Sequence, residues 1–311
     1  MRRQQAFIDN GKAFLKGGLH THTTRSDGRL TPEETLRYAA SQGYDFLALT
    51  DHQIYNFKNF APETGILVIP GMEHANDLTK GQGFRCFHTV CLGPAKEDGN
   101  GFEQDQITPY GILPDSEEYQ SVLDDFHAKN NLTIYCHPEW SSTSARYFEN
   151  QQGNFAMEIH NAGCAINNDC DVDASYWDEI LGQGKRLYGV ATDDAHAINE
   201  LCKGWVMVKA DKEINAVLNA LKNGEFYSTC GPEIYDFYIE DGKAVIDCSP
   251  VSRVRLHCDK HPTMLIKDPE GKITHAEFNI GGHWAGPYDY ARISLVDAEG
   301  KHAWTNPIFL K

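Results

Sequence analysis

Histidines and carboxylates recur along the first two thirds of the chain, each at or just after a short apolar run. His20 and His22 are two residues apart, and in an extended strand residues i and i+2 point to the same face. Both imidazoles can therefore reach one ion, with Asp27 arriving from the loop behind them. On its own, an HxH pair is more simply explained as two histidines that fall at this spacing by chance, on the surface or in the core. The residues that follow it predict a metal site, because they continue the same ligand types: His52, Glu73, His88, His137, Asp194 and His196.

The charge of the chain limits its partners. The 311 residues carry a formal net charge of −16 at pH 7, whereas binding to a nucleic-acid backbone needs clustered Lys and Arg. We therefore expect no nucleic-acid polymer as a partner. Small phosphate esters stay open as substrates, because bound cations invert the local field of an acidic cleft. The length and an apolar content of 41% fit one large globular domain with a small second one.

The sequence predicts a cytoplasmic protein. Its first residues lack the apolar core of a signal peptide. No stretch approaches the ~20 apolar residues that cross a bilayer, so we expect no membrane partner. The nine cysteines are an odd number without a repeated CxxC spacing. This pattern indicates reduced, mostly buried thiols rather than a disulfide framework.

Strand-like and helix-like segments alternate through the first 225 residues. Apolar runs bounded by breakers predict strands buried on both faces of a parallel sheet, at 46–49, 66–69, 132–135, 155–159 and 188–191. Thr31 and Glu34 form a predicted capping box with Pro32 at the first helical position, and Gly43 ends that helix. Further helices are expected from Asp115 to about Lys129, from Asp173, and from Asp211 to Asn223-Gly224.

Alternation of strands and helices favours a parallel α/β architecture. Every candidate ligand is expected at the C-terminal end of a strand, which is where barrel enzymes carry their chemistry. Ligands from strands spread along the chain favour a closed barrel, because an open sheet gathers its ligands at one switch point. We therefore expect a barrel within residues 1–230.

The pattern changes at about Glu233. Asp-Gly and Glu-Gly turns separate runs of β-formers, at 236–240, 251–257 and 291–296. No helix-length amphipathic segment appears, so residues 231–311 are predicted to form a small all-β module of sandwich type, joined at Gly231-Pro232. The segment 93–114 is long for a loop in a compact domain. It is expected to be either a lid over the metal site or a surface excursion.

The ligand series resembles the polymerase-and-histidinol-phosphatase (PHP) family of metal-dependent phosphoesterases. The family's motifs read HxH with a following SDG, TDH, GxE, a lone histidine, a CHP-like histidine and a DxH pair. All occur here in that order over about residues 17–225. The resemblance implies a distorted (β/α)7 TIM-like barrel. The tail, with Tyr227-Ser-Thr-Cys-Gly-Pro232 and Trp304-Thr-Asn-Pro-Ile-Phe309, is similar to the branch that includes carbaryl-hydrolase-type proteins.

The resemblance implies that two or three divalent transition-metal ions bind side by side. The first would be held by His20, His22, Glu73 and Asp194. The second would be held by a bridging Glu73 with His88 and His137. The third would be held by Asp27, His52 and His196. Some relatives carry histidine near the position of Asp27, so that carboxylate is either a ligand or a partner of one. A mixed shell of His and carboxylate suits Zn, Mn or Fe.

Three residues of the series are predicted to be catalytic. Asp193 and Asp194 compete for one ligand position, and strand-like spacing puts Asp194 on the same face as His196. We therefore predict that Asp194 is a ligand that also accepts the proton of the attacking water. Glu73, as the bridging carboxylate, and His196 complete the predicted catalytic set.

Other polar residues near the series have simpler explanations. Asp51 is expected to orient His52 or to cap a turn. His74 should point to the opposite face of its strand, and His160 either lines the pocket or packs in the core. Five histidines of the β module lack convergent spacing and are expected at the surface: His257, His261, His275, His283 and His302.

Substrate contacts are harder to predict. A phosphoester needs N–H or cationic donors besides the metals. The basic residues nearest to the ligand motifs are Arg25, Arg85, Arg146 and Lys203. Each alone has a simpler explanation as a solvated charge, yet at least one is expected to reach the pocket. Our predicted substrate-binding residues are Arg25, Lys203 and Arg146.

The leading hypothesis is a metal-dependent phosphoesterase that acts on a small phosphorylated metabolite or nucleotide. A second hypothesis keeps the same site but hydrolyses a carboxylic or carbamic ester. A third is a non-catalytic metal-binding scaffold. Structural metal sites close their coordination and keep few ligands, so retention of every family ligand speaks against the third hypothesis.

Overall fold

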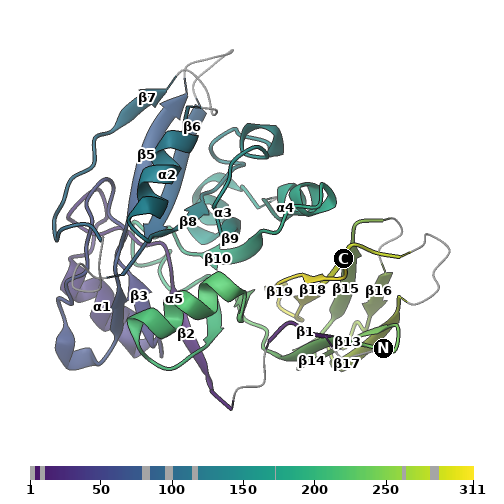
Figure 1. Cartoon of the computed structure of the whole chain (residues 1–311). Helices are drawn as coiled ribbons and strands as arrows, with labels where there is room; N and C mark the ends of the chain where they lie inside the picture. The colour runs from purple at the N-terminus through teal and green to yellow at the C-terminus, as the bar shows by residue number, and fades with distance from the viewer. Residues whose placement is uncertain are drawn as a thin grey trace.

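The computed structural model describes residues 4–7, 11–78, 85–94, 101–113, 118–171, 173–260, 264–280 and 287–311. These residues form a mixed α/β fold with three sheets and five α-helices. Figure 1 shows the helices grouped in one part of the molecule, with most strands of the C-terminal third gathered beside it. The expected α/β class is therefore confirmed for the part of the chain that carries the histidines.

Two runs of parallel strands frame that part. The first run pairs β2 (Phe14–Gly18), β3 (Phe46–Ala48) and β4 (Leu67–Ile69). The second pairs β8 (Leu132–Tyr135), β9 (Ala156–Asn161) and β10 (Tyr188–Thr192). Apolar side chains from both runs share a core with those of helix α5 (Ile214–Asn223), including Phe46, Ile134 and Val217, all 0% exposed. Apart from β2, which was not among them, these strands overlap the predicted apolar runs.

An antiparallel hairpin interrupts the parallel arrangement. Strands β5 (Gly71–Leu78) and β6 (Arg85–Leu92) pair antiparallel, and β6 is also antiparallel to β8. The expectation of parallel strands throughout is wrong here, because residues 79–84 are too few for the crossover of a dozen or more residues that parallel neighbours need. The short strand β7 (Gly111–Leu113) adds to the free edge of β5.

Two isolated parallel bridges connect the sheets near the ends of their strands. One joins Thr21 to Ala195 and the other joins His52 to Glu73. They bring together the segments that carry most of the candidate ligands. Closure of all strands into a distorted (β/α)7 barrel stays a prediction.

The helix ends follow their capping residues. In α1 (Pro32–Ser41) the Thr31 hydroxyl accepts from the Glu34 N–H and the Glu34 carboxylate accepts from the Thr31 N–H, which confirms the capping box. Helix α5 (Ile214–Asn223) ends as predicted at Gly224, whose φ of 75° is left-handed. The start of α5 was predicted too early. Asp211 does not cap the helix, because its carboxylate accepts a hydrogen bond from the Lys12 ammonium, and the helix begins at Ile214.

The remaining helices differ more from the expectation. Helix α2 (Gln120–Ala128) begins later than predicted, after a turn at Glu118 and Tyr119, and Asp115 lies outside the described residues. Helix α4 (Asp173–Gly182) starts at Asp173. Helix α3 (Ala162–Asn168) was not predicted. It follows β9 directly, and its first turn is capped by the Asn161 side chain, which accepts from the Cys164 N–H. Single 3-10 turns occupy Pro62–Thr64 and Ala145–Tyr147.

The described residues after 231 contain strands and no helix, as expected. The strands are β13 (Ile234–Glu240), β14 (Lys243–Val251), β15 (Arg253–Cys258), β16 (Met264–Lys267), β17 (Ile273–Asn279), β18 (Tyr290–Val296), β19 (His302–Thr305) and β20 (Ile308–Phe309). Asp241 and Gly242 both have positive φ, which suits a two-residue hairpin between β13 and β14. Apolar side chains from the sheet of β13 and the sheet of β18 share one core, including Phe237 and Ile293, both 0% exposed.

Sheet pairing crosses the predicted boundary at residues 230 and 231. Strand β12 (Phe226–Thr229) pairs with β11 (Trp205–Lys209) on one side and with β19 on the other. Strand β11 in turn pairs with β2. At the other end of the chain, β1 (Gln4–Gln5) pairs with β13. Hydrogen bonding is therefore continuous from the C-terminal strands to β2, and the division into two domains stays a prediction.

A buried ion pair joins α4 to the C-terminal strands. The Arg292 guanidinium is 0% exposed, donates to the Asp178 carboxylate at 2.6 and 2.8 Å, and lies over the Trp177 ring. His257 belongs to the same cluster, 3.0 Å from Asp178 Oδ2. The prediction that His257 is a surface histidine is therefore wrong. His275 is exposed and pairs with Asp247. His302 is partly buried and stacks on Trp304, while His261 and His283 lie outside the described residues.

All nine cysteines are free thiols. Four of them, Cys91, Cys136, Cys164 and Cys248, are buried. None of the described helices combines the length and the apolar character needed to span a bilayer.

Candidate metal centre

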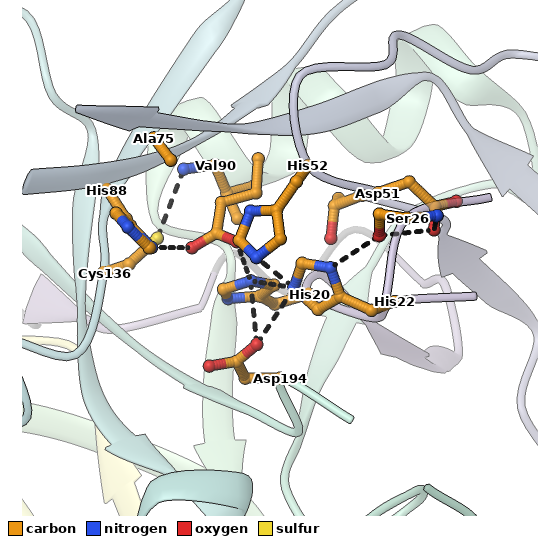
Figure 2. A network of polar contacts seen from close by, with 12 residues as sticks. His20, His22, Ser26, Asp51, His52, Ala75, His88, Val90, Cys136 and Asp194 are labelled. Atoms are coloured by element: carbon orange, nitrogen blue, oxygen red, sulfur yellow. Dashed lines mark hydrogen bonds and ion pairs between the residues drawn. The ribbon is translucent and has the colours of Figure 1, made fainter. Parts of the chain in front are cut away.

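The polar cluster forms where the chain leaves β2 and β10. The His22 N–H donates to the Ala195 carbonyl and the Asp194 N–H donates to the His20 carbonyl, both at 3.0 Å. These backbone bonds hold the two segments side by side. Figure 2 shows the side chains of His20, His22 and Asp194 pointing toward one another, with His52 beside them.

Four buried side chains bring one atom each to a common point. The Nε2 atoms of His20 and His22 lie 3.1 Å apart. They lie 3.4 and 3.2 Å from Glu73 Oε2, and 3.2 and 3.0 Å from Asp194 Oδ1. The four residues are between 0% and 8% exposed.

Hydrogen bonds alone do not satisfy this group. Glu73 Oε2 and Asp194 Oδ1 are buried and have no hydrogen-bond partner within the described chain. Each imidazole Nε2 carries at most one hydrogen but faces several acceptors. In a tetrahedral zinc shell with bonds of about 2.0–2.2 Å, neighbouring ligand atoms lie roughly 3.3–3.6 Å apart. The observed separations are close to these values, so the four side chains fit one transition-metal ion.

The two oxygens of Glu73 face different histidines. Oε1 lies 2.9 Å from His88 Nδ1 and 3.2 Å from His137 Nε2, whereas Oε2 lies 2.9 Å from His52 Nδ1 and faces the group described above. This arrangement suits a carboxylate that bridges two ions. His88 lies within antiparallel β6 and Glu73 near the start of β5, so the expectation that every ligand ends a strand is wrong for both.

A third group lies at the rim. Asp27 Oδ2 is 3.4 Å from His196 Nε2 and 3.7 Å from His52 Nε2, and Asp27 Oδ1 is 3.6 Å from His22 Nδ1. The Asp27 side chain is 55% exposed and that of His196 is 35% exposed. The separations are longer and the residues are more open than in the first group. The described chain thus brings all nine predicted ligands into one cluster.

Burial and ion pairing act against each other on the pKa values. Burial lowers the pKa of His22, but the Asp194 and Glu73 carboxylates beside its Nε2 raise it overall to about 10. Burial raises the pKa of Glu73, yet the neighbouring His20 and His88 bring it well below its usual range. Without metal, the cluster therefore holds imidazolium and carboxylate charges. A divalent cation would replace those protons on binding.

Glu158 orients His20 and was missed in the sequence. It is 0% exposed, and its Oε1 lies 2.7 Å from His20 Nδ1. Its Oε2 accepts from the His137 and Asn161 N–H groups. A carboxylate on Nδ1 fixes the tautomer that leaves Nε2 free for a metal. The available signal was a glutamate inside the apolar run 155–159, because a buried carboxylate needs a partner.

Other contacts hold the remaining ligands. His137 Nδ1 lies 2.9 Å from the Ser141 hydroxyl, and His196 Nδ1–H donates to the Asp194 carbonyl at 3.0 Å. Asp51 accepts from the N–H groups of Thr23 and Ser26. Asp51 therefore caps the turn after His22, one of its two expected roles.

The two neighbouring aspartates have separate surroundings. Asp193 accepts the N–H groups of Cys202, Lys203 and Gly204 at 2.6–2.8 Å and is 0% exposed. Asp194 faces the histidines, as expected, but for a different reason. It lies beyond β10 with a left-handed φ of 47°, so strand alternation does not orient it. His137 also has positive φ, and such backbone strain is common at functional sites.

The groups open onto a cavity of about 270 Å³. It is lined by the candidate ligands Asp27, His52, Glu73, His88, His137, Asp194 and His196. Trp140 and the α3 residues Gly163, Cys164, Asn167 and Asn168 complete the described lining. Neither Trp140 nor α3 was expected to contribute.

None of the four basic residues considered for substrate binding lines this cavity. Arg25 contacts Asp105 and donates to Asn56, and Arg85 donates to the Ser142 carbonyl. Arg146 and Lys203 are exposed. The prediction that Arg25, Lys203 and Arg146 bind the substrate therefore finds no support, because none of the three lines the cavity.

Two further residues and one segment are placed outside the cavity. His74 is buried beside Thr108 and Phe126, which fits its expected structural role. His160 pairs with Asp171 and stacks on Trp304, so it packs rather than lines the pocket. The described part of the segment 93–114 includes β7 and the buried Phe102, and none of its described residues lines the cavity. The lid hypothesis gains no support from them.

Comparison with known proteins identifies the larger part of the chain. A model of the PHP domain matches residues 18–227. A 5′-3′ exoribonuclease from Haemophilus influenzae is 44% identical over 62 residues, which are 19% of this chain and 23% of that protein. The chain therefore spans less than a quarter of the length of that relative.

Two solved structures match the chain at low identity. A two-domain protein from Bacteroides vulgatus, which contains a predicted PHP-like metal-dependent phosphoesterase, matches 99% of both chains with 14% identity and a TM-score of 0.50. An amidohydrolase from Chromobacterium violaceum, solved with sulfate and no metal, matches 60% of this chain and 89% of its own with 16% identity and a TM-score of 0.42.

Proposed function

The chain belongs to the PHP domain family, and on that premise we propose that it is a metal-dependent phosphoesterase acting on a small phosphorylated metabolite or nucleotide. The observation that carries the proposal is the position of Glu73. This buried carboxylate turns one oxygen toward His20, His22 and His52, and the other toward His88 and His137. Paired ions on either side of one carboxylate suit phosphoester hydrolysis.

The residues that would hold the ions fall into three sets. The first is His20, His22, Glu73 and Asp194. The second is Glu73, His88 and His137. The third, at the rim, is Asp27, His52 and His196. When bound, divalent ions such as Zn, Mn or Fe lower the pKa of coordinated water from 15.7 to about 7 and stabilise the attacking and leaving oxygens.

The chain itself positions the proton-transfer groups. Asp194 Oδ2 is fixed by a hydrogen bond from the Asn161 amide at 3.0 Å, while Oδ1 faces His20 and His22. Asp194 is therefore held as a ligand that accepts a proton from the attacking water. The Nδ1–H of His196 donates to the Asp194 carbonyl, which leaves His196 Nε2 at the open rim for a metal or a proton.

We place this activity in a cytoplasmic protein of the branch with carbaryl-hydrolase-type members. Its residues 1–230 would form a distorted (β/α)7 barrel, with residues 231–311 as a supporting β module. The small cavity and the net charge of −16 favour a small substrate over a nucleic-acid polymer.

The test is a substrate panel on metal-free protein reconstituted with Zn, Mn or Fe. We expect two or three ions per chain and hydrolysis of phosphomonoesters or phosphodiesters. His275→Ala serves as a matched control, because His275 is an exposed histidine of the β region that pairs with Asp247. It should keep both metal content and rate, whereas the double replacement of His20 and His22 by Ala should remove one ion and nearly all hydrolysis.

Two other results would reject the proposal. Hydrolysis of aryl carboxylic or carbamic esters without any phosphoester turnover would favour the ester hydrolase. Full metal content with no hydrolysis of any substrate class would favour a metal-binding scaffold.

A further inference from the structure

Trp140 is an exposed aromatic side chain beside the candidate metal ligands. Its ring is 41% exposed and lines the cavity. Its centroid lies 5.0 Å from that of His137, edge to face, and 6.0 Å from that of His88. The indole thus rests against two ligand imidazoles while keeping much of its surface open. Leaving an aromatic surface in water gives up hydrophobic stabilisation, which a ligand stacked on the indole would recover.

The loop that carries Trp140 is fixed on both sides of it. The Ser141 N–H donates to the His137 carbonyl at 3.0 Å, and the Thr143 N–H donates to the Pro138 carbonyl at 2.9 Å. The Glu139 N–H donates to the buried Asp173 carboxylate at 2.8 Å. The indole is therefore presented by an ordered backbone, and a ligand would not have to pay the entropy of ordering it.

The part of the lining that is not made of candidate ligands is polar but carries no cation. Among the described residues it is formed by Trp140 together with Gly163, Cys164, Asn167 and Asn168 of α3. The Asn167 amide N–H donates to Glu200 Oε1 at 3.0 Å, which leaves its carbonyl oxygen as an acceptor. The described lining contains no Lys or Arg, and its histidines belong to the candidate ligand set. A second anionic group on a substrate would meet no Lys or Arg in this part of the lining to compensate its charge.

These observations describe the part of the substrate that does not react. Building on the proposed phosphoesterase activity, we propose that Trp140 is a specificity-determining residue that stacks a flat, uncharged ring of the leaving group, as in a nucleoside or an aryl alcohol. The phosphoryl group would face the ligand side of the cavity, and the ring would lie on the indole. Gly163 supports this arrangement, because a Cβ there would lie 2.8 Å from the Asp194 carbonyl oxygen. The absence of that Cβ lets α3 pack directly against the ligand loop.

The test compares substrates with similar leaving groups, with and without a ring. Adenosine 5′-monophosphate and glycerol 3-phosphate both release a primary alcohol, but only the first carries a ring. Phenyl phosphate is the second substrate with a ring in the leaving group. In the metal-loaded protein, Trp140→Leu should lower kcat/KM for the two ring substrates by about tenfold, mostly through KM, as expected for loss of one stacking contact. Glycerol 3-phosphate should change less than about twofold, and Trp140→Phe should restore most of the loss because it retains an aromatic face.

Several outcomes would overturn the inference. An equal loss on all three substrates would assign Trp140 a structural role, and unchanged kinetics on adenosine 5′-monophosphate would exclude stacking. A higher kcat/KM for adenosine 3′,5′-bisphosphate than for the monophosphate would also contradict it, because the cavity would then accept a second anionic group without a Lys or Arg in its described lining.

A failure of the proposed function gives a different result. In that case the wild-type protein hydrolyses none of the three phosphoesters, glycerol 3-phosphate included. Calorimetric binding of adenosine 5′-monophosphate to the metal-loaded wild type and to Trp140→Leu then decides the inference. Equal affinity of the two proteins would reject it, and about tenfold weaker binding to the variant would support it.

Discussion

The PHP region (residues 18–227) buries a cluster of imidazoles and carboxylates besides its apolar core, whereas the C-terminal β region (residues 231–311) buries mainly apolar side chains. In the PHP region His20, Glu73 and Glu158 are at most 1% exposed. In the C-terminal β region the core is formed by side chains such as Phe237 and Ile293, both 0% exposed. Buried charges cost free energy unless they are paired or bind metal, whereas buried apolar surface stabilises the fold directly. Metal binding and folding stability should therefore respond to different substitutions.

The two regions also use their buried ion pairs differently. Arg292 and Asp178 join α4 to β18, each with well-formed hydrogen bonds and an aromatic or imidazole neighbour. In the metal cluster, Glu73 Oε2 and Asp194 Oδ1 lack hydrogen-bond partners in the described structure. Arg292 Nη1 is also buried without a partner in the described structure, but the guanidinium directly faces one opposite charge. The metal cluster instead gathers unpartnered ligand atoms around one point, which suits a bound cation.

The largest effect is expected from Glu73→Gln. The amide cannot bridge two cations as a carboxylate does, so at least one ion should be lost and turnover should fall on the order of 10³-fold. Metal analysis and steady-state kinetics measure both quantities. Glu277→Gln is the matched control, since Glu277 is an exposed partner of Lys243 in the C-terminal β region. Normal metal content in Glu73→Gln would contradict the bridging role.

The second prediction reverses the pattern. Phe237→Ala should lower the free energy of unfolding by about 3–5 kcal/mol, because it opens a cavity in an apolar core. Metal content and turnover of the folded fraction should stay unchanged. Tyr235→Ala provides the control, because Tyr235 lies in the same strand but is 57% exposed. Loss of metal from folded Phe237→Ala would show that the apolar core around Phe237 and the metal cluster are energetically coupled.

The sequence predicted local features well. The capping box of α1 and the left-handed Gly224 after α5 depend on residues close in the chain, and both are present. The ligand series was also recognisable, because each member follows or interrupts an apolar run. The antiparallel direction of β6 was not predicted, since a strand buried on both faces has the same apolar pattern in either direction.

Features that depend on distant contacts were not recognised. Glu158 orients His20 across 138 residues of chain, and Trp140 has significance only through its position beside two ligand rings. The orientation of Asp194 depends on a positive φ that no spacing rule contains. The basic residues were selected by their distance in sequence, but their side chains extend to other partners.

The third prediction concerns Glu158→Gln. Removing the carboxylate that holds His20 should weaken metal affinity by about 10–100-fold without removing a ligand. Competition with a chelator of known affinity measures the change. Glu179→Gln, an exposed glutamate on α4, should leave the affinity as it is. An unchanged affinity in Glu158→Gln would mean that other contacts orient His20.

The fourth prediction separates the neighbouring aspartates. Asp193→Asn leaves at least one of three buried N–H groups without its carboxylate acceptor, so it should cost about 1–3 kcal/mol of stability. Turnover per bound metal should remain near wild type. Asp194→Asn should show the opposite pattern, with a large loss of turnover and a small change in thermal stability. The reverse ranking of turnover would identify Asp193 as the functional carboxylate.

The smallest effect is a pH dependence confined to the PHP region. The pKa of His22 is raised from 6.5 to about 10 in the metal-free cluster, so its protonation stabilises the metal-free fold below pH 6.5, and that stability is lost as pH rises toward 10. Metal needs the neutral imidazole, so affinity should increase by up to about tenfold per pH unit for each proton released between pH 6.5 and 8.5. In the C-terminal β region, burial lowers the pKa of His257 to about 4. His257 is therefore almost fully neutral in both the folded and the unfolded state from about pH 7.5 upward, and it adds little pH dependence there. Calorimetry of metal binding in buffers of different ionisation enthalpy counts the protons released, and a count of zero at pH 7.5 would contradict a protonated His22.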